Sequence, residues 1–528
     1  MKHLSGLDAL FLSSETPATP MNVGSLHLYD VPQGRRRNFF ATVKRHIARR
    51  LHLVPVFWRK LNPMPLRAAD PTWVEDDDVD LDYHVRRIVL EPPGSLMQLE
   101  ACAARLHSTL LDREHPLWEF YVIEGLASGQ VGFYTKIHHA ALDGAAGVAL
   151  VAGLLDVTPQ PRKVERPRKS DSHEPIPGTV ELLGAALQKT WSQYKDFAGL
   201  LPDTVTTARS SLPKDWEFGP KTPLNVAITA ERSFATLSLP LQDMQQIAHR
   251  VHATLNDVLL AVCSGGLRCY LADHGGVPEK PLIAAVPVSL RRPGDTEMNT
   301  QATMALASLA THVAAPVERL IAIRDSSDAA KQFVDKIKSP ILTDFPSLGV
   351  PWLIGSLVSL YGRTGIANVI PPIANVIISN IRGSEVPLYL AGARMATYWP
   401  ISIPTHGIAL NITAQSYCGS LDFGLTACRR ALPDVRDLAR YMADSYQELK
   451  DAVLGAGGRA SKTTLPRRLE APQATEHGVA AHAAPASGAK ARGATRLRSA
   501  SATKREGVSG SHAAKRPNAR ARRTKSPS

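Results

Sequence analysis

Two adjacent histidines and an Asp-Gly pair are the residues of this sequence whose types and spacing could do chemistry. Residues 138–144 read His-His-Ala-Ala-Leu-Asp-Gly. The preceding residues, 131–137, alternate as a β-strand does, and apolar residues recur at helical spacing from Gly144 to Leu155. The pattern predicts that His138 and His139 stand where a strand ends and that the Asp-Gly pair stands where a helix begins. Rigid elements on both sides would then fix the direction of an imidazole.

Four kinds of chemistry compete for this segment. Zinc binding is disfavoured because adjacent histidines on a strand diverge, and the sequence has no HExxH segment or paired cysteine; we predict no metal. A serine or cysteine nucleophile is disfavoured because no nucleophile elbow such as GxSxG is present. A purely structural role would make Asp143 a helix N-cap. General-base catalysis suits an imidazole, whose ordinary pKa of about 6.5 lies near working pH. The last two readings stay open on the residues alone.

The positive charge of the chain resides in its C-terminal tail. The net charge is +13, but 16 of the 61 basic and 3 of the 48 acidic residues follow residue 455, which leaves 45 of each in the rest. The body therefore has no general basic character, which argues against a nucleic-acid-binding function for it. The tail is rich in Ala, Ser, Gly, Pro, Arg and Lys, and we predict that it is disordered. It could be a solvated appendage or could contact anionic lipid or nucleic acid.

Five scattered cysteines without a CxxC pair are typical of a reducing cytosol. No secretory signal is expected at the N-terminus. Two uncharged stretches, 345–362 and 364–381, reach the minimum length of a membrane span. Prolines interrupt both stretches, so we predict that neither crosses a membrane.

The hydrophobic periodicity predicts an α/β protein in four parts. These are an N-terminal half (1–157), a Pro-rich basic linker with a crossover helix (158–224), a C-terminal half (225–455) and the tail (456–528). Strands are expected at 23–29, 120–124, 131–137, 234–239, 283–288, 376–383, 408–413 and 421–426. Helices are expected near 40–51, 97–110, 144–155, 180–201, 241–251, 255–271 and 435–454. The 254–257 segment matches a capping box, in which Asp257 reaches back to the start of its helix.

Several further segments, taken with 138–144 in order, resemble one known family. They are 4–12 (LSGLDALFL), 20–24 (PMNVG), 116–118 (PLW), 256–258 (NDV), 286–291 (VPVSLR) and 379–380 (SN). The His-His-x-x-x-Asp-Gly segment is similar to the signature of acyltransferases of the chloramphenicol acetyltransferase type. Over residues 1–455 the chain resembles the bacterial wax ester synthase/diacylglycerol acyltransferase family within that superfamily.

The resemblance implies a fold of two α/β sandwich domains of the chloramphenicol acetyltransferase type with a central channel. It implies that His139 is the base that deprotonates the acceptor hydroxyl, supported by His138. Asp143, followed by Gly144, would be structural and ion-paired with an arginine, for which we select Arg291. Asn256 would shape the site or steady the oxyanion. Asp257 would contribute to the site or would only form the capping box. Trp118 would line a substrate pocket or would only pack in the hydrophobic core.

The resemblance also implies the substrates and the location. Acyl-CoA would be the co-substrate, without a cofactor, and diacylglycerol or a long-chain alcohol would be the acceptor. The protein would be cytoplasmic and peripheral at the inner membrane or at lipid inclusions. Stretches 345–362 and 364–381 would line an acyl tunnel, touch the bilayer surface or pack in the core. The alternatives are a condensation-type transferase that uses a carrier-bound donor, and a catalytically silent lipid-inclusion protein. The sequence does not set the oligomeric state.

Overall fold

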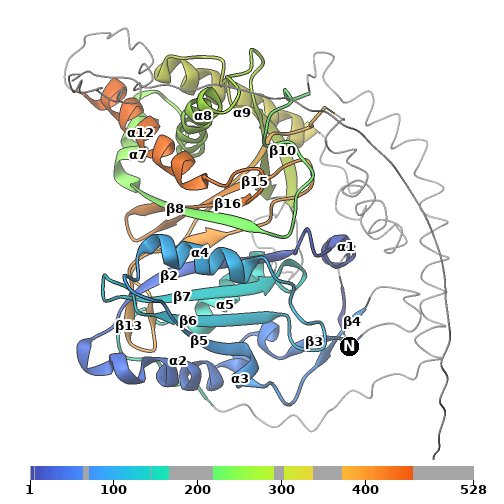
Figure 1. Cartoon of the computed structure of the whole chain (residues 1–528), viewed down its shortest axis with the longest axis vertical. Coiled ribbons are helices and arrows are strands. Elements are labelled where there is room, and N and C mark those ends of the chain that lie inside the picture. The colour runs from blue at the N-terminus through green and yellow to red at the C-terminus, as the bar shows by residue number, and fades with distance from the viewer. Residues whose placement is uncertain are drawn as a thin grey trace, which may run out of the picture. The chain divides into compact units, whose positions relative to one another are not determined.

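Two mixed β-sheets with helices packed against them carry the described part of the chain (Figure 1). The computed structural model describes residues 2–4, 6–62, 71–142, 144–165, 218–289, 302–336 and 371–455. All of these belong to one compact unit, residues 1–458. The linker helix expected at 180–201, stretch 345–362, residues 364–370 and the tail (456–528) lie outside the described residues.

The first sheet has seven strands and holds the two histidines. Its order is β12-β13-β2-β7-β6-β5, with β14 also paired to β2. Only β5 and β6 run parallel to each other; the remaining pairs in this sheet are antiparallel. The strands are β2 (Asn22–Asp30), β5 (Val85–Val89), β6 (Trp118–Glu124), β7 (Val131–His138), β12 (Tyr389–Leu390), β13 (Ala393–Met395) and β14 (Trp399–Ile401).

The second sheet has six strands, in the order β10-β9-β11-β15-β16-β8. They are β8 (Arg232–Pro240), β9 (Ile283–Ser289), β10 (Ala302–Ser308), β11 (Val376–Ile381), β15 (Leu410–Tyr417) and β16 (Ser420–Cys428). A small sheet holds β1 (Lys2–His3), β4 (Thr72–Glu75) and β3 (Arg59–Asn62). Strands β12–β14 come from the C-terminal part of the sequence but extend the first sheet, so the chain ties its two halves together by strand pairing.

The helices cover both sheets. Figure 1 shows α7 (Leu241–Arg250), α8 (Leu255–Asp273), α9 (Pro316–Lys336) and α12 (Val435–Leu454) gathered on one side of the second sheet, where they pack on one another. The remaining helices are α1 (Gly6–Ser14), α2 (Phe39–Ala48), α3 (Leu81–His84), α4 (Leu96–His107) and α5 (Gly144–Leu154). Short 3-10 helices cover Gln33–Asn38, Leu51–Leu53, Pro55–Phe57 and His139–Ala141.

Helix α4 joins the two halves because it packs on both β7 and β8. Its buried Glu100 accepts hydrogen bonds from the backbone N–H and the hydroxyl of Thr236 on β8, at 3.0 and 2.7 Å, and pairs with Arg436 of α12. A buried carboxylate that is fully partnered fixes the register of the two elements it bridges.

The α/β character and most element positions agree with the sequence expectations. Strand β7 and helix α5 flank the histidines as predicted, and α12 spans the predicted residues. Within the described ranges, α8 is the one helix long and apolar enough to cross a membrane, but most of its residues are buried among the neighbouring helices. That burial is typical of a core helix.

Candidate active site

The strand register brings the histidine pair to one edge of the first sheet. Asn22, which begins β2, lies opposite His138, and Trp118, which begins β6, lies opposite Ile137. The backbone N–H of His138 donates to the carbonyl of Leu117 at 3.0 Å, and that of His139 donates to the carbonyl of Met21 at 2.8 Å. Both histidines are therefore held by backbone hydrogen bonds that they donate to the residues immediately before β6 and β2.

His138 is completely buried, with one ring nitrogen hydrogen-bonded and the other facing a carboxylate. Its Nδ1 accepts a hydrogen bond from the Ala140 N–H at 3.1 Å, which leaves the ring proton on Nε2. That nitrogen lies 3.3 Å from Oε1 of Glu15. This ring is thus a support rather than a substrate-contacting group, because it is wholly buried between the Ala140 N–H and the Glu15 carboxylate.

Glu15 is the acidic partner that sequence reasoning missed. Its carboxylate also accepts bonds from the Met21 N–H at 3.1 Å and from Arg113 at 2.9 Å. Burial opposes its negative charge, but the contacts with His138 and Arg113 outweigh burial and lower the pKa of Glu15 to about 2. The signal was present in the sequence, since Glu15 is the only Asp, Glu, Lys or Arg between Asp8 and Asp30.

His139 is in a different environment. Its ring stacks on Phe11 of α1, with the ring centroids 3.8 Å apart, and part of the residue remains exposed. Its Nδ1 is buried and finds no side-chain or backbone partner of good geometry among the described residues. Burial lowers the pKa of His139 to about 4; its own backbone carbonyl opposes this shift, and His138 adds to it. The imidazole is therefore neutral at pH 7, with a lone pair available to accept a proton.

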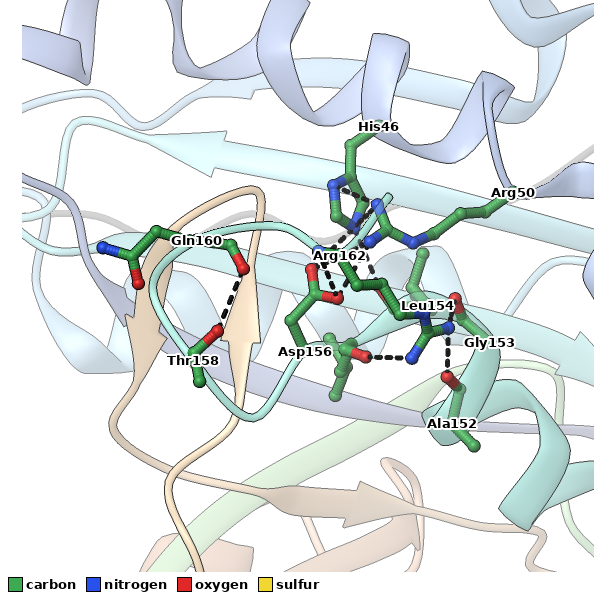
Figure 2. Close-up of polar contacts among 10 residues, drawn as sticks. His46, Arg50, Ala152, Gly153, Leu154, Asp156, Thr158, Gln160 and Arg162 are labelled. Atoms are coloured by element: carbon green, nitrogen blue, oxygen red, sulfur yellow. Dashed lines mark hydrogen bonds and ion pairs between the residues drawn. The ribbon is translucent and has the colours of Figure 1, made fainter. Parts of the chain in front are cut away.

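Helix α5 begins at Gly144 and is anchored at its far end. The eleven residues of α5 are all Gly, Ala, Val or Leu, so the helix has no polar side chain with which to hold itself in place. Arg162 donates to the carbonyls of Ala152 and Gly153, the latter at 2.9 Å, and His46 of α2 donates to that of Leu154 at 2.8 Å (Figure 2). These carbonyls lie in the last turn of the helix, have no partner within it and carry the negative end of the helix dipole. Cationic groups and N–H donors are therefore suitable partners for them.

A buried ion pair completes this anchor. Both Nη2 bonds of Arg50 to the two oxygens of Asp156 measure 2.9 Å, and Nη1 of Arg50 donates to His46 Nδ1 at 2.6 Å (Figure 2). Burial lowers the pKa of His46 to about 4, which keeps its ring neutral. Asp156 also pairs through its backbone with Tyr389 of β12. The anchor thus joins α2, α5 and the strands that arrive from the C-terminal half.

The remaining predicted site residues have mixed placements. Asp257 is buried and forms the capping box, accepting from the N–H and hydroxyl of Thr254 at 2.8 and 2.7 Å. Asn256 is half-buried at the second position of α8. Trp118 is wholly buried, stacked on His84 and bonded to the Phe57 carbonyl, which is the core placement that the sequence left open. Asp143 and Arg291 lie outside the described residues.

The two-sheet α/β fold and the histidine pair at the end of β7 agree with the acyltransferase class that the family resemblance implied. The family model described as the wax ester synthase/diacylglycerol acyltransferase catalytic domain matches residues 4–259, and the WS/DGAT C-terminal domain matches residues 299–450. A putative diacylglycerol O-acyltransferase of Mycobacterium tuberculosis is 37% identical over 454 residues, covering 85% of this chain and 100% of the relative. The O-acyltransferase WSD of Acinetobacter baylyi is 35% identical over 472 residues, covering 85% and 96%.

A solved structure agrees with these relatives. The wax ester synthase/diacylglycerol acyltransferase of Marinobacter aquaeolei VT8 superposes with a TM-score of 0.65 at 31% identity, covering 86% of this chain and 100% of the other. The chain belongs to the wax ester synthase/diacylglycerol acyltransferase family, and it is an acyltransferase with the two-part α/β fold of that family.

Proposed function

We propose that the protein transfers a long-chain acyl group from acyl-CoA to the hydroxyl of diacylglycerol or of a long-chain alcohol. The observation that carries the proposal is the partly exposed imidazole of His139, whose Nδ1 has no partner among the described residues, beside the buried His138 that faces Glu15 at 3.3 Å. The printed functions of the relatives support the substrate classes, because they are named as diacylglycerol O-acyltransferases and a wax ester synthase.

In the proposed reaction His139 is the general base. Its lone pair takes the proton of the acceptor hydroxyl while the oxygen attacks the thioester carbonyl carbon. A C–O bond forms, the tetrahedral intermediate collapses with loss of the C–S bond, and the imidazolium returns the proton to the CoA thiolate. Because the donor is already a thioester, no acyl-enzyme is needed, and a positioned base of this kind contributes about 10²–10⁴-fold.

The other predicted residues have supporting parts in this proposal. His138 and Glu15 hold the strand end from which His139 projects. Asp143 is assigned a structural role with Arg291, and Asn256 a role in shaping the site or steadying the oxyanion. These last assignments depend on the family resemblance and are tested by substitution.

We also propose that the protein works at a lipid surface as a peripheral protein. Diacylglycerol and long-chain alcohols reside in membranes or lipid inclusions, so a protein that consumes them must reach that phase. Flotation of the purified protein with vesicles of phosphatidylglycerol and with neutral-lipid emulsions tests this. Recovery of all the protein in the unbound fraction with both would reject it.

The substrates are tested by incubating purified protein with labelled palmitoyl-CoA and either hexadecanol or dioleoylglycerol. We expect CoA release matched by wax ester or triacylglycerol, and no labelled protein after denaturing quench. Failure to form neutral lipid with either acceptor would reject the proposed substrates. Label retained covalently on the chain during turnover would reject direct transfer.

A further inference from the structure

Phe11 of α1 covers one face of the His139 ring, and the mechanism above does not use it. The two ring centroids are 3.8 Å apart and the ring planes are inclined by 19°, so the rings are stacked. Residues 4–12, the segment that contains Phe11, contribute to the family resemblance, yet the proposed reaction gives them no part. The position of this aromatic ring against the base therefore calls for an explanation.

The protein holds the Phe11 ring in place through the packing of α1. This helix packs on the 3-10 helix that contains His139. Leu12 is buried in an apolar cluster that includes Ala140, the next residue after His139. Phe11 packs against the same cluster with its side chain half-buried. Just beyond the helix, the carboxylate of Glu15 accepts a hydrogen bond from the backbone N–H before β2, at 3.1 Å. The stack is thus built into the site from both ends of this segment.

The charge of His139 changes during the proposed reaction, and an aromatic ring can act on that change. The imidazole is neutral before it takes the proton of the acceptor hydroxyl and is a planar cation afterwards. Burial opposes the cation, because it lowers the pKa of His139 to about 4. The face of a phenyl ring is the negative part of its quadrupole, and it attracts a cation that lies within about 6 Å of its centroid. The separation of 3.8 Å lies well inside that range.

We propose that Phe11 is a positioning residue for acyl transfer, whose ring face stabilises the imidazolium that forms when His139 takes the acceptor proton. The inference rests on the proposed role of His139 as the general base. Because the phenyl ring lies over the face of the imidazole, it leaves the lone pair in the plane of the base unobstructed. Because it has no net charge, it favours the cation without holding a proton on the ring as strongly as a carboxylate would.

The test changes the electron density of the phenyl ring at nearly constant shape. Phenylalanine at position 11 is replaced by its mono-, di- and trifluorinated analogues through a reassigned stop codon. Fluorine withdraws electrons from the ring face and is only slightly larger than hydrogen, so packing is retained while attraction to a cation weakens. The same series at Phe40, a half-buried phenylalanine of α2, is the matched control. The readouts are kcat and KM with palmitoyl-CoA and a soluble alcohol, beside the melting temperature.

If the inference holds, log kcat falls stepwise with each fluorine added at position 11, while KM, the melting temperature and the Phe40 series stay level. Phe11→Leu keeps an apolar side chain but removes the aromatic face, so its kcat should be about 5–30-fold lower, which corresponds to about 1–2 kcal/mol. Phe11→Tyr keeps the ring and should restore most of that loss. Equal kcat values throughout the fluorinated series at position 11 would overturn the inference and leave Phe11 as a packing residue only.

A second measurement tests the stack itself and does not depend on turnover. Protons that lie over the face of a phenyl ring are magnetically shielded, so the ring protons of His139, assigned by NMR with His139→Gln, should resonate upfield in the wild type. The upfield shift should persist in Phe11→Tyr and disappear in Phe11→Leu. An unchanged His139 resonance in Phe11→Leu would contradict the stack on which the inference depends. Absence of lipid product from the wild-type protein would instead reject the proposed function.

Discussion

The negative charge of Glu15, which faces His138, can be removed by a substitution that leaves the shape of the side chain unchanged. Glu15→Gln keeps the length and planarity of the side chain but removes its charge. The group is 3% exposed and contacts His138 at 3.3 Å, Arg113 at 2.9 Å and the Met21 N–H at 3.1 Å. The substitution therefore weakens three contacts of one buried group.

The size of the effect follows from the shifted pKa. The pKa of Glu15 falls from the ordinary 4.5 to about 2 in the folded protein, and one unit corresponds to about 1.4 kcal/mol, so the charge contributes about 3 kcal/mol of folding free energy. Because the folded pKa is the lower one, this contribution is complete above pH 4.5 and is lost as pH falls toward 2. At pH 3 it amounts to about 1.5 kcal/mol.

Urea unfolding at pH 7 and at pH 3 measures this difference. We expect Glu15→Gln to be about 3 kcal/mol less stable than the wild type at pH 7 and about half as much less stable at pH 3. Acyl transfer should fall at least tenfold, because His138 loses its charged partner. The exposed Glu114→Gln is the matched control and should change neither property. Equal stability of Glu15→Gln and the wild type at pH 7 would refute the reasoning.

Three more predictions concern the anchor, the base and the tail. Asp156→Ala leaves the buried Arg50 without its partner, so urea unfolding should show a free energy of unfolding lower by about 3–5 kcal/mol. The control Lys44→Met breaks an exposed pair with Asp82 and should lower it by at most about 1 kcal/mol. Similar losses in the two variants would contradict the stabilising role of the Arg50–Asp156 pair. Because the pKa of His139 is lowered to about 4, kcat/KM should stay level from about pH 6 to 8 and decline only as pH approaches 4; a midpoint near 6.5 would show that burial does not control this ring. Truncation after residue 455 should leave turnover of soluble acceptors within about twofold, and a collapse of activity would show that the tail is part of the catalytic unit.

Short-range patterns in the sequence predicted those features of the site that depend only on residues close together in the chain. The alternation over 131–137 and the apolar spacing after Gly144 correctly placed His138 and His139 at the end of β7. The Thr254–Asp257 capping box was also predictable, because both partners lie within one helical turn.

Contacts between distant segments were not predictable in this way. Glu15 reaches His138 from 123 positions away, and its neighbours in sequence give no direction for its side chain. The alternating pattern assigned Lys136 a face of β7 but could not show that α4 buries that face. Likewise, nothing local indicates that residues 393–401 pair with β2 rather than with the second sheet.

The most direct test of the central claim is the rate of acyl transfer by His139→Ala. Steady-state CoA release and neutral-lipid formation from palmitoyl-CoA are measured with saturating hexadecanol and with dioleoylglycerol, beside the wild type and at matched folding by circular dichroism. General-base catalysis by His139 predicts a kcat lower by about 10²–10⁴-fold with intact acyl-CoA binding. A kcat within twofold of the wild type would contradict the account.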